Sequence, residues 1–153
     1  MATLVREMSQ MDLPSVIEIG KRMHAESDNF RRHPLSIPKL QEMCRRALLT
    51  KDIMCFVAET NGEIVGLWAG FTSELWYSDT KIVSDIVLFV DKSHRKGTAA
   101  PRLMKVAEKW ARGMGAKILY QGLRSGIDTE TTACFFNKIG FGNDAIQLQK
   151  DIS

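Results

Sequence analysis

The chain has 153 residues, of which 44% are apolar and 25% are charged, so it can bury one substantial core but is too short for two ordinary domains. Positive and negative residues are mixed along the sequence and the net charge is only +3. This composition excludes a disordered chain and does not indicate a nucleic-acid-binding protein. We therefore expect a single domain over residues 1–153, with no nucleic acid among its partners.

The cysteine and histidine residues indicate neither a disulfide framework nor a metal site. Three cysteines, Cys44, Cys55 and Cys134, are an odd number without CxxC spacing, a pattern typical of reduced thiols. His33 and His94 have no clustered carboxylates or cysteines beside them, so we expect no metal. No apolar run is long enough to span a membrane, and the first residues lack the apolar stretch of a signal peptide. We therefore expect a cytoplasmic protein without a membrane partner.

The first third of the chain predicts a short strand followed by two helices. Thr3–Met8 alternates apolar and polar residues, as a half-buried strand does. Asp12 stands before Leu-Pro, an arrangement typical of a helix start, and the apolar residues that follow predict a helix over Pro14–His24. After a polar loop, Ile37–Leu49 has the spacing of a second amphipathic helix.

The middle of the chain predicts three strands. Met54–Ala58 is a short apolar run that leads into Asn61-Gly62, a dipeptide typical of tight hairpin turns. The returning strand is predicted over Ile64–Thr72. Lys81–Val90 is the longest run with strand-forming residues, and it is largely apolar on both faces, as a central strand is.

The last third alternates helices with short strands. Its apolar spacing predicts a helix over Ala100–Gly113, a strand over Ala116–Leu123 and a helix over Thr129–Ile139. A last short strand is predicted over Ala145–Leu148. The whole order is β, α, α, β, β, β, α, β, α, β, which indicates a mixed α/β domain around one sheet.

The turn between the long strand and the following helix is predicted to bind an anion. A strand that leads through a short turn into a helix leaves several backbone N–H groups unpaired at the positive end of the helix dipole. This turn also carries Lys92, His94, Arg95 and Lys96, followed by small residues. An ordinary solvated basic turn is the alternative, but the position directly after a long apolar strand favours the anion site. Neither P-loop nor Rossmann spacing is present.

The same turn resembles the acetyl-CoA signature of the GNAT superfamily, which reads R/Q-x-x-G-x-G/A. When the strand and the helix are kept aligned, Arg95 takes the first position, Thr98 the central glycine and Ala100 the last position. A register shifted by one residue would use His94, Gly97 and Ala99. The late segment FFNKIGF and the opening VREMSQMDLPSVIEI are also similar to the family, so the resemblance covers nearly the whole chain.

The resemblance implies a fold and a cofactor site. The fold is a mostly antiparallel sheet that is splayed at the central strand and flanked by about four helices. In such a fold Leu88, Phe89 and Val90 would line the pantetheine arm of acetyl-CoA. The residues implied at its pyrophosphate are Arg95, Lys96, Gly97, Thr98, Ala99 and Ala100. Two further cofactor contacts are implied on the late helix, at Thr129 and Phe136.

Two departures from the family concern the chemistry. Relatives often have a tyrosine near the CoA sulfur as the acid, and here Phe136 stands in its place and cannot donate a proton. Relatives also often have asparagine where this chain has Thr129. For the base, Ser84 and Asp85 are the polar residues inside the long strand. The usual base position aligns nearer Ser84, and Asp85 has a strand-end hydrogen-bonding role as its alternative.

Other candidates lie near the expected acceptor groove. His24 and Glu26 end the first helix, which in this family lies beside that groove, although a solvent-facing helix end is the simpler interpretation. Trp68, Trp76 and Tyr77 are candidates for the walls of the groove, although aromatic residues near strand ends more often belong to the core.

The resemblance therefore implies an acetyl-CoA-dependent N-acetyltransferase that acetylates a primary amine by direct attack in a ternary complex. The alternative, kept open by Thr129 and Phe136, is a catalytically weak or inactive CoA-binding or interaction protein of the same fold. The acceptor is open among small amines, polyamines, antibiotics and protein amines. The edges of such a sheet would also allow a homodimer.

Overall fold

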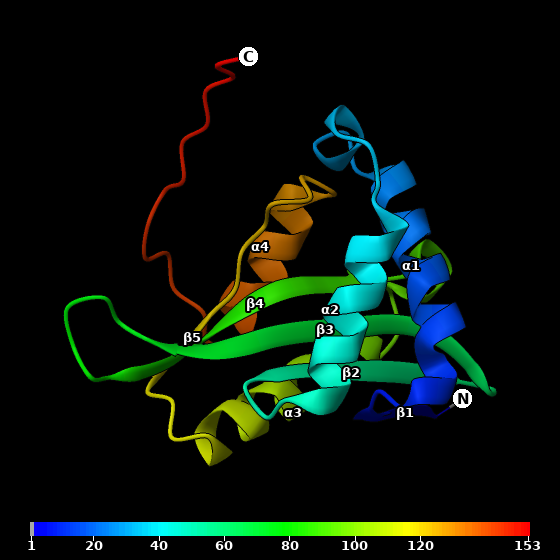
Figure 1. Cartoon of the computed structure of the whole chain (residues 1–153), viewed down its shortest axis with the longest axis horizontal. Coiled ribbons are helices and arrows are strands. Elements are labelled where there is room, and N and C mark those ends of the chain that lie inside the picture. Colours follow the sequence, from blue (N-terminus) through cyan, green and yellow to red (C-terminus); the bar gives the residue numbers. More distant parts are fainter. Residues whose placement is uncertain (1) are drawn as a thin grey trace.

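The computed structural model describes residues 2–153 and has one sheet flanked by four helices (Figure 1). Three short 3₁₀ turns connect these elements, at Gln10–Asp12, Phe30–Arg32 and Lys92–His94. The strands and helices are β1 (Thr3–Glu7), α1 (Leu13–Glu26), α2 (Ile37–Leu49), β2 (Ile53–Thr60), β3 (Glu63–Glu74), β4 (Lys81–Val90), α3 (Ala99–Gly113), β5 (Ile118–Tyr120) and α4 (Thr129–Lys138).

The sheet is mixed and open, with its five strands in the order of the sequence. β1, β2, β3 and β4 pair in antiparallel fashion, and β5 joins β4 in parallel. The β2–β3 turn has Asn61 at φ 53° and Gly62 at φ 79°, the pair of positive angles that the asparagine–glycine dipeptide predicts. The predicted α/β class, with a mostly antiparallel sheet and four helices, is confirmed.

The core has two layers, one on each face of the sheet. Neighbouring residues of a strand point to opposite faces, so Leu67 packs under α1 and α2 while Trp68 packs under α3. Both side chains are buried, and Trp68 is completely enclosed. Each large apolar side chain buried in this way contributes roughly 1.5–3 kcal/mol to folding. The two layers fix the position of β4, which is sandwiched between them.

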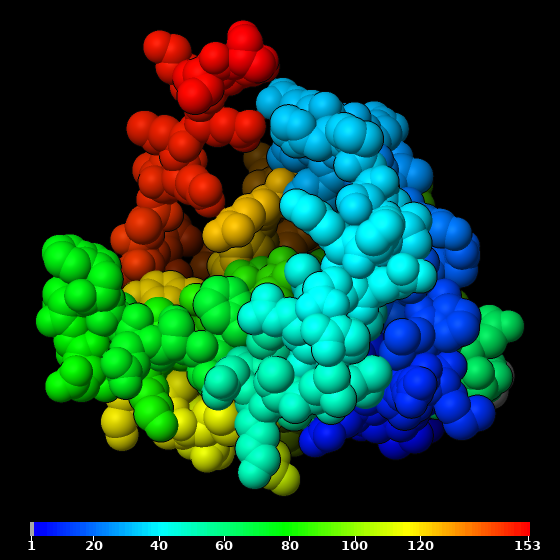
Figure 2. All heavy atoms as spheres, in the orientation of Figure 1, coloured from blue at the N-terminus to red at the C-terminus, as the bar shows by residue number. Residues whose placement is uncertain are grey.

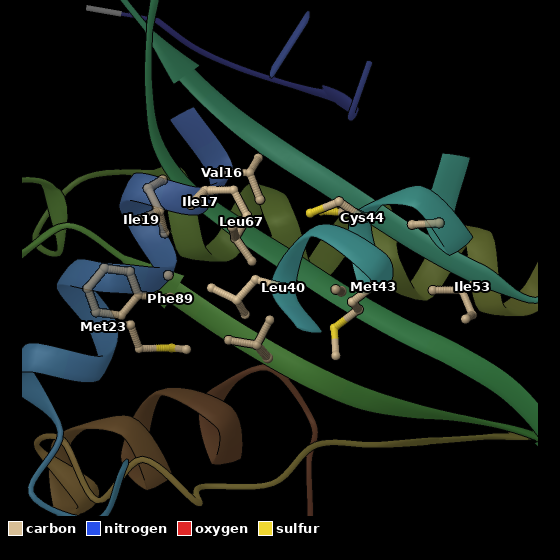
Figure 3. Close-up of a pocket in the computed structure, with 15 residues that line it drawn as sticks. Val16, Ile17, Ile19, Met23, Leu40, Met43, Cys44, Ile53, Leu67 and Phe89 are labelled. Atoms are coloured by element: carbon tan, nitrogen blue, oxygen red, sulfur yellow. The ribbon is translucent and has the colours of Figure 1, made fainter. Parts of the chain in front are cut away.

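A small cavity remains in the layer between the sheet and the helices α1 and α2 (Figure 3). Its volume is about 70 Å³, and its walls are almost entirely apolar. Met23, Leu40 and Phe89 point toward one another across it, and the thiol of Cys44 lies on its wall. Dry cavities with apolar walls are tolerated but forfeit packing energy.

β4 and β5 stay paired over only a short length. Ile82–Ser84 pairs with Ile118–Tyr120, and the pairing ends there. On its other side β4 pairs with β3 throughout, except at a bulge where Ala69 faces Val87 and Gly70 faces Asp85, which leaves Ile86 unpaired. The edge of β4 on the β5 side is therefore free from Asp85 onward, as the resemblance predicts for a splayed central strand.

Two of the predicted strands differ from the structure. The strand predicted over Ala116–Leu123 is shortened to β5, because the amide of Gly122 donates to the carboxylate of Asp85 instead of to a strand. The strand predicted over Ala145–Leu148 is wrong. Ile146 and Leu148 are each 88% exposed, and this part of the chain runs away from the sheet (red in Figure 1) without a partner for its backbone groups.

The cysteines are free thiols, with Cys44 and Cys55 buried and Cys134 exposed. Within residues 2–153 no group of three histidine, cysteine or acidic side chains is arranged to hold a metal ion. The same part of the chain has no helix that is long and apolar enough to cross a membrane.

Candidate active site

The turn after β4 leaves backbone donors unused. Its first part forms the 3₁₀ turn Lys92–His94, and α3 begins at Ala99. In the described part of the chain, no protein acceptor is bonded to the amides of Lys96, Thr98, Ala99 or Ala100. Because α3 is 15 residues long, its dipole adds positive potential at these amides. The turn therefore has the donors of an anion site.

Thr98 adopts an ordinary backbone conformation in this turn, with φ −98° and ψ 1°. This conformation has a negative φ and is open to residues other than glycine. Threonine at this position therefore causes no backbone strain. Lys92 and Lys96 are exposed beside the turn and supply positive charge to its surface.

Arg95 is directed away from these amides, back toward β4 and α1. Its two terminal nitrogens donate to the carboxylate of Glu26 at 2.5 and 2.6 Å, and its Nε donates to the carbonyl of Val90 at 2.9 Å. Its guanidinium also lies 5.2 Å from the centre of the Phe89 ring, within cation–π range. The hydrogen bonds from Arg95 lower the pKa of Glu26 below its usual range. The end of α1 is therefore bound to the turn by a two-pronged ion pair.

The last residues of β4 present their backbone to the open side of the sheet. Phe89 packs with the α1–α2 layer, whereas Leu88 and Val90 pack with the α3 layer. Their side chains are thus committed to the two cores, and their main-chain groups face β3 on one side and the free edge on the other. This free edge leads directly into the turn with the unused amides.

Asp85 lies at the point where β4 and β5 separate. Its Oδ1 accepts the amide of Gly122 at 2.9 Å, and its Oδ2 accepts the side-chain amide of Gln121 at 3.0 Å. Gln121 in turn accepts the indole N–H of Trp68 at 3.1 Å. Burial raises the pKa of Asp85 above its usual value, against the opposing effect of these hydrogen bonds and of the charge of Arg124.

An open cleft connects the candidate catalytic residues of β4 with two candidate cofactor residues of α4. Ser84, Asp85, Thr129 and Phe136 all line it, together with Tyr120, which pairs with Ser84. The cleft is bounded by β5, α4, the loop after α1 and the C-terminal residues. Figure 2 shows the hollow between the C-terminal residues (red) and the loop after α1 (light blue). Leu88–Val90 and the turn residues 95–100 are not part of this lining.

The aromatic candidates lie in different places. Trp68 belongs to the core, with its indole nitrogen bonded to Gln121. Trp76 and Tyr77 form an edge-to-face pair at the exposed tip of the β3–β4 hairpin and do not line the cleft. The interpretation of these two residues as walls of the acceptor groove is therefore not supported. His24 is also occupied, since its Nε2 donates to the carbonyl of His33 at 2.7 Å.

Comparison with known proteins identifies the family. The Acetyltransferase (GNAT) family matches residues 19–141 of the chain. The chain belongs to this family. A search among curated proteins gives no match.

Solved structures share the GNAT fold at low sequence identity. Meta-AAC0020, an aminoglycoside acetyltransferase from an uncultured soil metagenomic sample solved with sisomicin, has 17% identity and a TM-score of 0.74, with 99% of this chain and 97% of that chain covered. AAC(6')-Iy, solved with the bisubstrate analogue CoA-S-monomethyl-acetylneamine, has 16% identity and a TM-score of 0.77, with 99% of each chain covered. A transcriptional regulator from Bacillus halodurans C-125 has 15% identity and a TM-score of 0.81, with 99% and 100% covered.

The late helix, α4, carries Thr129 and Phe136, the two residues at which we expect a departure from the family pattern. Phe136 is buried in an aromatic cluster, with the ring centres of Phe135 and Phe141 at 5.1 and 5.3 Å. Thr129 is exposed at the first position of α4, after Asp128, whose φ is +44°. Phe136 thus supports the packing of α4 and also lines the cleft.

Three features of this GNAT site were not found from the sequence. The partner of Arg95, the bond between Gln121 and Asp85, and the position of Tyr120 opposite Ser84 all depend on contacts between distant segments. The spacing of charges on α1 and on the turn is the one sequence signal that could have indicated the partner of Arg95. Arg22 and Glu26 are four residues apart, and so are Asp91 and Arg95, with the signs reversed.

Proposed function

We propose that the protein is an acetyl-CoA-dependent N-acetyltransferase that transfers an acetyl group to a primary amine by direct attack within a ternary complex. The observation that carries this proposal is the free edge of β4, which runs from Asp85 into the unused amides at the start of α3. Pantetheine has amides that can pair with a strand edge, and a pyrophosphate suits a helix N-terminus. These residues therefore fit CoA chemically.

The proposal assigns the contacts along this path. The main chain of Leu88, Phe89 and Val90 would lie along the pantetheine arm and pair with it through the groups that face the free edge. The amides of Lys96, Thr98, Ala99 and Ala100, with Gly97 giving room for close approach, would hold the pyrophosphate. The positive charges of Lys92 and Lys96 would add attraction. Acetyl-CoA supplies the activated acetyl thioester.

Asp85 is the proposed base, alone or through a water held near Ser84. The acceptor amine loses its proton to this base, its nitrogen bonds to the thioester carbonyl carbon, and the carbon–sulfur bond breaks to give the amide and the thiolate of CoA. The raised pKa of Asp85 suits a proton acceptor. Phe136 provides no acid, so the thiolate takes its proton from water, and we expect slow but real turnover.

A thiol-release assay tests this function. Acetyl-CoA is incubated with the protein and a panel of amines that includes polyamines, aminoglycosides and a lysine peptide, with the Phe136→Tyr variant alongside. We expect release of CoA that depends on the amine, and faster release by the variant if the hydroxyl reaches the sulfur. Phe136→Leu is the matched control for repacking, since it adds no hydroxyl. Absence of turnover by every form on every amine would overturn the enzymatic function.

A second function, a CoA-binding module without turnover, is favoured by one observation. Phe136 is used for packing within the aromatic cluster of α4, so the usual acid is missing without an evident replacement. Calorimetric binding of CoA separates the two functions. Binding without turnover would favour the module, and absence of binding would contradict both.

A further inference from the structure

The end of α1 is attached to the turn after β4 by two ion pairs of opposite polarity. Arg22 donates to both carboxylate oxygens of Asp91, at 2.9 and 3.0 Å, and one helical turn later Glu26 accepts from both terminal nitrogens of Arg95, at 2.5 and 2.6 Å. The second pair is more sheltered, with both side chains less than a third exposed. A sheltered two-pronged pair holds its geometry better than an exposed one.

The residues after α1 are bound to the loop between β5 and α4. Ser27 is completely buried, and its hydroxyl donates to the carbonyl of Ser125 at 2.6 Å. Asn29 donates to the carbonyl of Arg124 at 3.0 Å. This asparagine packs so closely on Gly126 that a side chain there would lie 2.7 Å from its amide nitrogen. The end of α1 therefore connects the turn after β4 with the loop that precedes α4.

We propose that Glu26 is a positioning residue of the cofactor site, which acts by holding Arg95 and so fixes the turn with its amides directed toward the pyrophosphate. This inference rests on the proposed function, because it concerns the same CoA site. It assigns to Arg95, the first residue of the family signature, the task of shaping the turn. The phosphate contacts then fall to the backbone amides of residues 96–100.

The contacts of Arg95 favour this role over direct phosphate binding. Its Nε and both terminal nitrogens already donate to Val90 and Glu26, and its guanidinium carbon lies over the Phe89 ring. Turning toward the helix start would break these bonds and leave the half-buried carboxylate of Glu26 without its main partner. In the competing arrangement Glu26 merely occupies Arg95 until a phosphate displaces it. That arrangement predicts the opposite effect of removing the Glu26 charge.

The test measures the dissociation constants of CoA and of pantetheine, which lacks phosphates, by calorimetry. Glu26→Gln should raise the dissociation constant of CoA by about tenfold and that of pantetheine by less than about twofold, since only the phosphate end of CoA depends on the turn. Glu18→Gln is the matched control, because Glu18 makes an exposed pair with Lys21 on the same helix and should change neither constant. Glu26→Asp keeps the charge on a shorter side chain and should bind CoA more tightly than Glu26→Gln but more weakly than the unmodified protein. If Glu26→Gln does not fold, the selective loss of CoA affinity over pantetheine affinity is measured on Glu26→Asp instead.

A double-mutant cycle with Arg95→Ala completes the experiment. If both residues act as one unit, Arg95→Ala combined with Glu26→Gln weakens CoA no more than Arg95→Ala alone. Tighter CoA binding by Glu26→Gln, an unchanged constant, an equal loss for both ligands or additive losses would each overturn the inference. If the unmodified protein binds no CoA at all, the proposed function itself fails, which is a distinct result.

Discussion

The carboxylate of Asp85 accepts the side-chain amide of Gln121, 3.0 Å away, at the point where β4 and β5 stop pairing. One oxygen of the same carboxylate accepts the main-chain amide of Gly122, so Asp85 holds the end of β5 against β4. This bonding is the strand-end role that the sequence left open beside a catalytic one. The two roles are compatible, because a carboxylate has lone pairs left for a water or an amine.

Replacing Asp85 with asparagine separates the two roles. If Asp85 is the base, Asp85→Asn lowers kcat by about 10²–10⁴-fold, and it removes the limb on which the rate of the unmodified protein rises with pH. That limb is shifted to higher pH than for an ordinary aspartate, because burial raises the pKa of Asp85 and only the ionised form accepts a proton. Gln121→Ala is the control, since it loses the structural bond but keeps the carboxylate. Equal rates for both variants would leave Asp85 a purely structural residue.

Gly70 is required by the packing of Trp68. A methyl group at this position would lie 2.6 Å from Cζ2 of the indole and 2.9 Å from the carbonyl oxygen of Ser84. We expect Gly70→Ala to lower the free energy of unfolding by about 1–3 kcal/mol, as overpacked cores do. Urea unfolding followed by tryptophan fluorescence measures the change.

Gly113 provides the matched comparison for Gly70. A methyl group there would meet no atom within 4 Å, and the residue lies in α3. Gly113→Ala should therefore be neutral or stabilise the protein by up to about 1 kcal/mol. If the two variants lose the same stability, the close approach of Gly70 to Trp68 does not explain the glycine.

Asp12 makes the free energy of unfolding depend on pH in the acidic range. It accepts two hydrogen bonds from Arg6 and two from Ser9, and the Arg6 guanidinium holds the pKa of this buried carboxylate at about 2. Because the folded-state pKa is lowered, the stabilisation is complete above the unfolded pKa near 4 and is lost as the pH falls toward 2. The lowered pKa of Asp12 contributes about 2 kcal/mol to the free energy of unfolding at neutral pH. Urea unfolding between pH 2 and 7 measures it.

The Asp12→Asn variant is the control for this pH dependence, because it keeps the shape of the side chain without its charge. The difference in unfolding free energy between the two proteins should shrink from pH 5 to pH 2. Parallel curves over this range would contradict the assignment to Asp12.

The three thiols should differ sharply in reactivity. Burial raises the pKa of Cys55 to about 12 and also raises the pKa of Cys44, whereas Cys134 is exposed on α4. Since the thiolate is the reactive form, a disulfide reagent at pH 8 should titrate one thiol in the folded protein and three in denaturant. Cys134→Ser should remove the fast thiol. Fast reaction of a second thiol would mean that the layer under α1 and α2 opens readily.

The fold was largely predictable because its signals are local. The asparagine–glycine turn, the apolar run of β4 and the helical spacing of α2 each follow from neighbouring residues, and α2 and β4 have the predicted bounds. The failure at Ala145–Leu148 has a physical reason. Alternating apolar residues describe a surface that can pair, but whether a partner strand lies within reach depends on the rest of the fold.

The site was predictable only in part. The position of the turn followed from its order after β4, but the orientation of Arg95 did not, since its partner Glu26 is 69 residues away. The same holds for Asp85, whose bonds to Gln121 and Gly122 depend on where β5 ends. Contacts between distant segments decide which charged side chains are free for a ligand, and sequence spacing does not contain that information.

The most direct test of the proposed cofactor path is an NMR titration of isotope-labelled protein with CoA. Saturable shifts should be concentrated in the main-chain amides of Leu88 and Val90, which face the free edge of β4 on either side of Phe89, and in those of residues 96–100 at the start of α3. The distant β2–β3 turn at Asn61 should stay unchanged and serves as the internal control. Absence of shifts at millimolar CoA, or shifts that avoid both segments, would contradict the account.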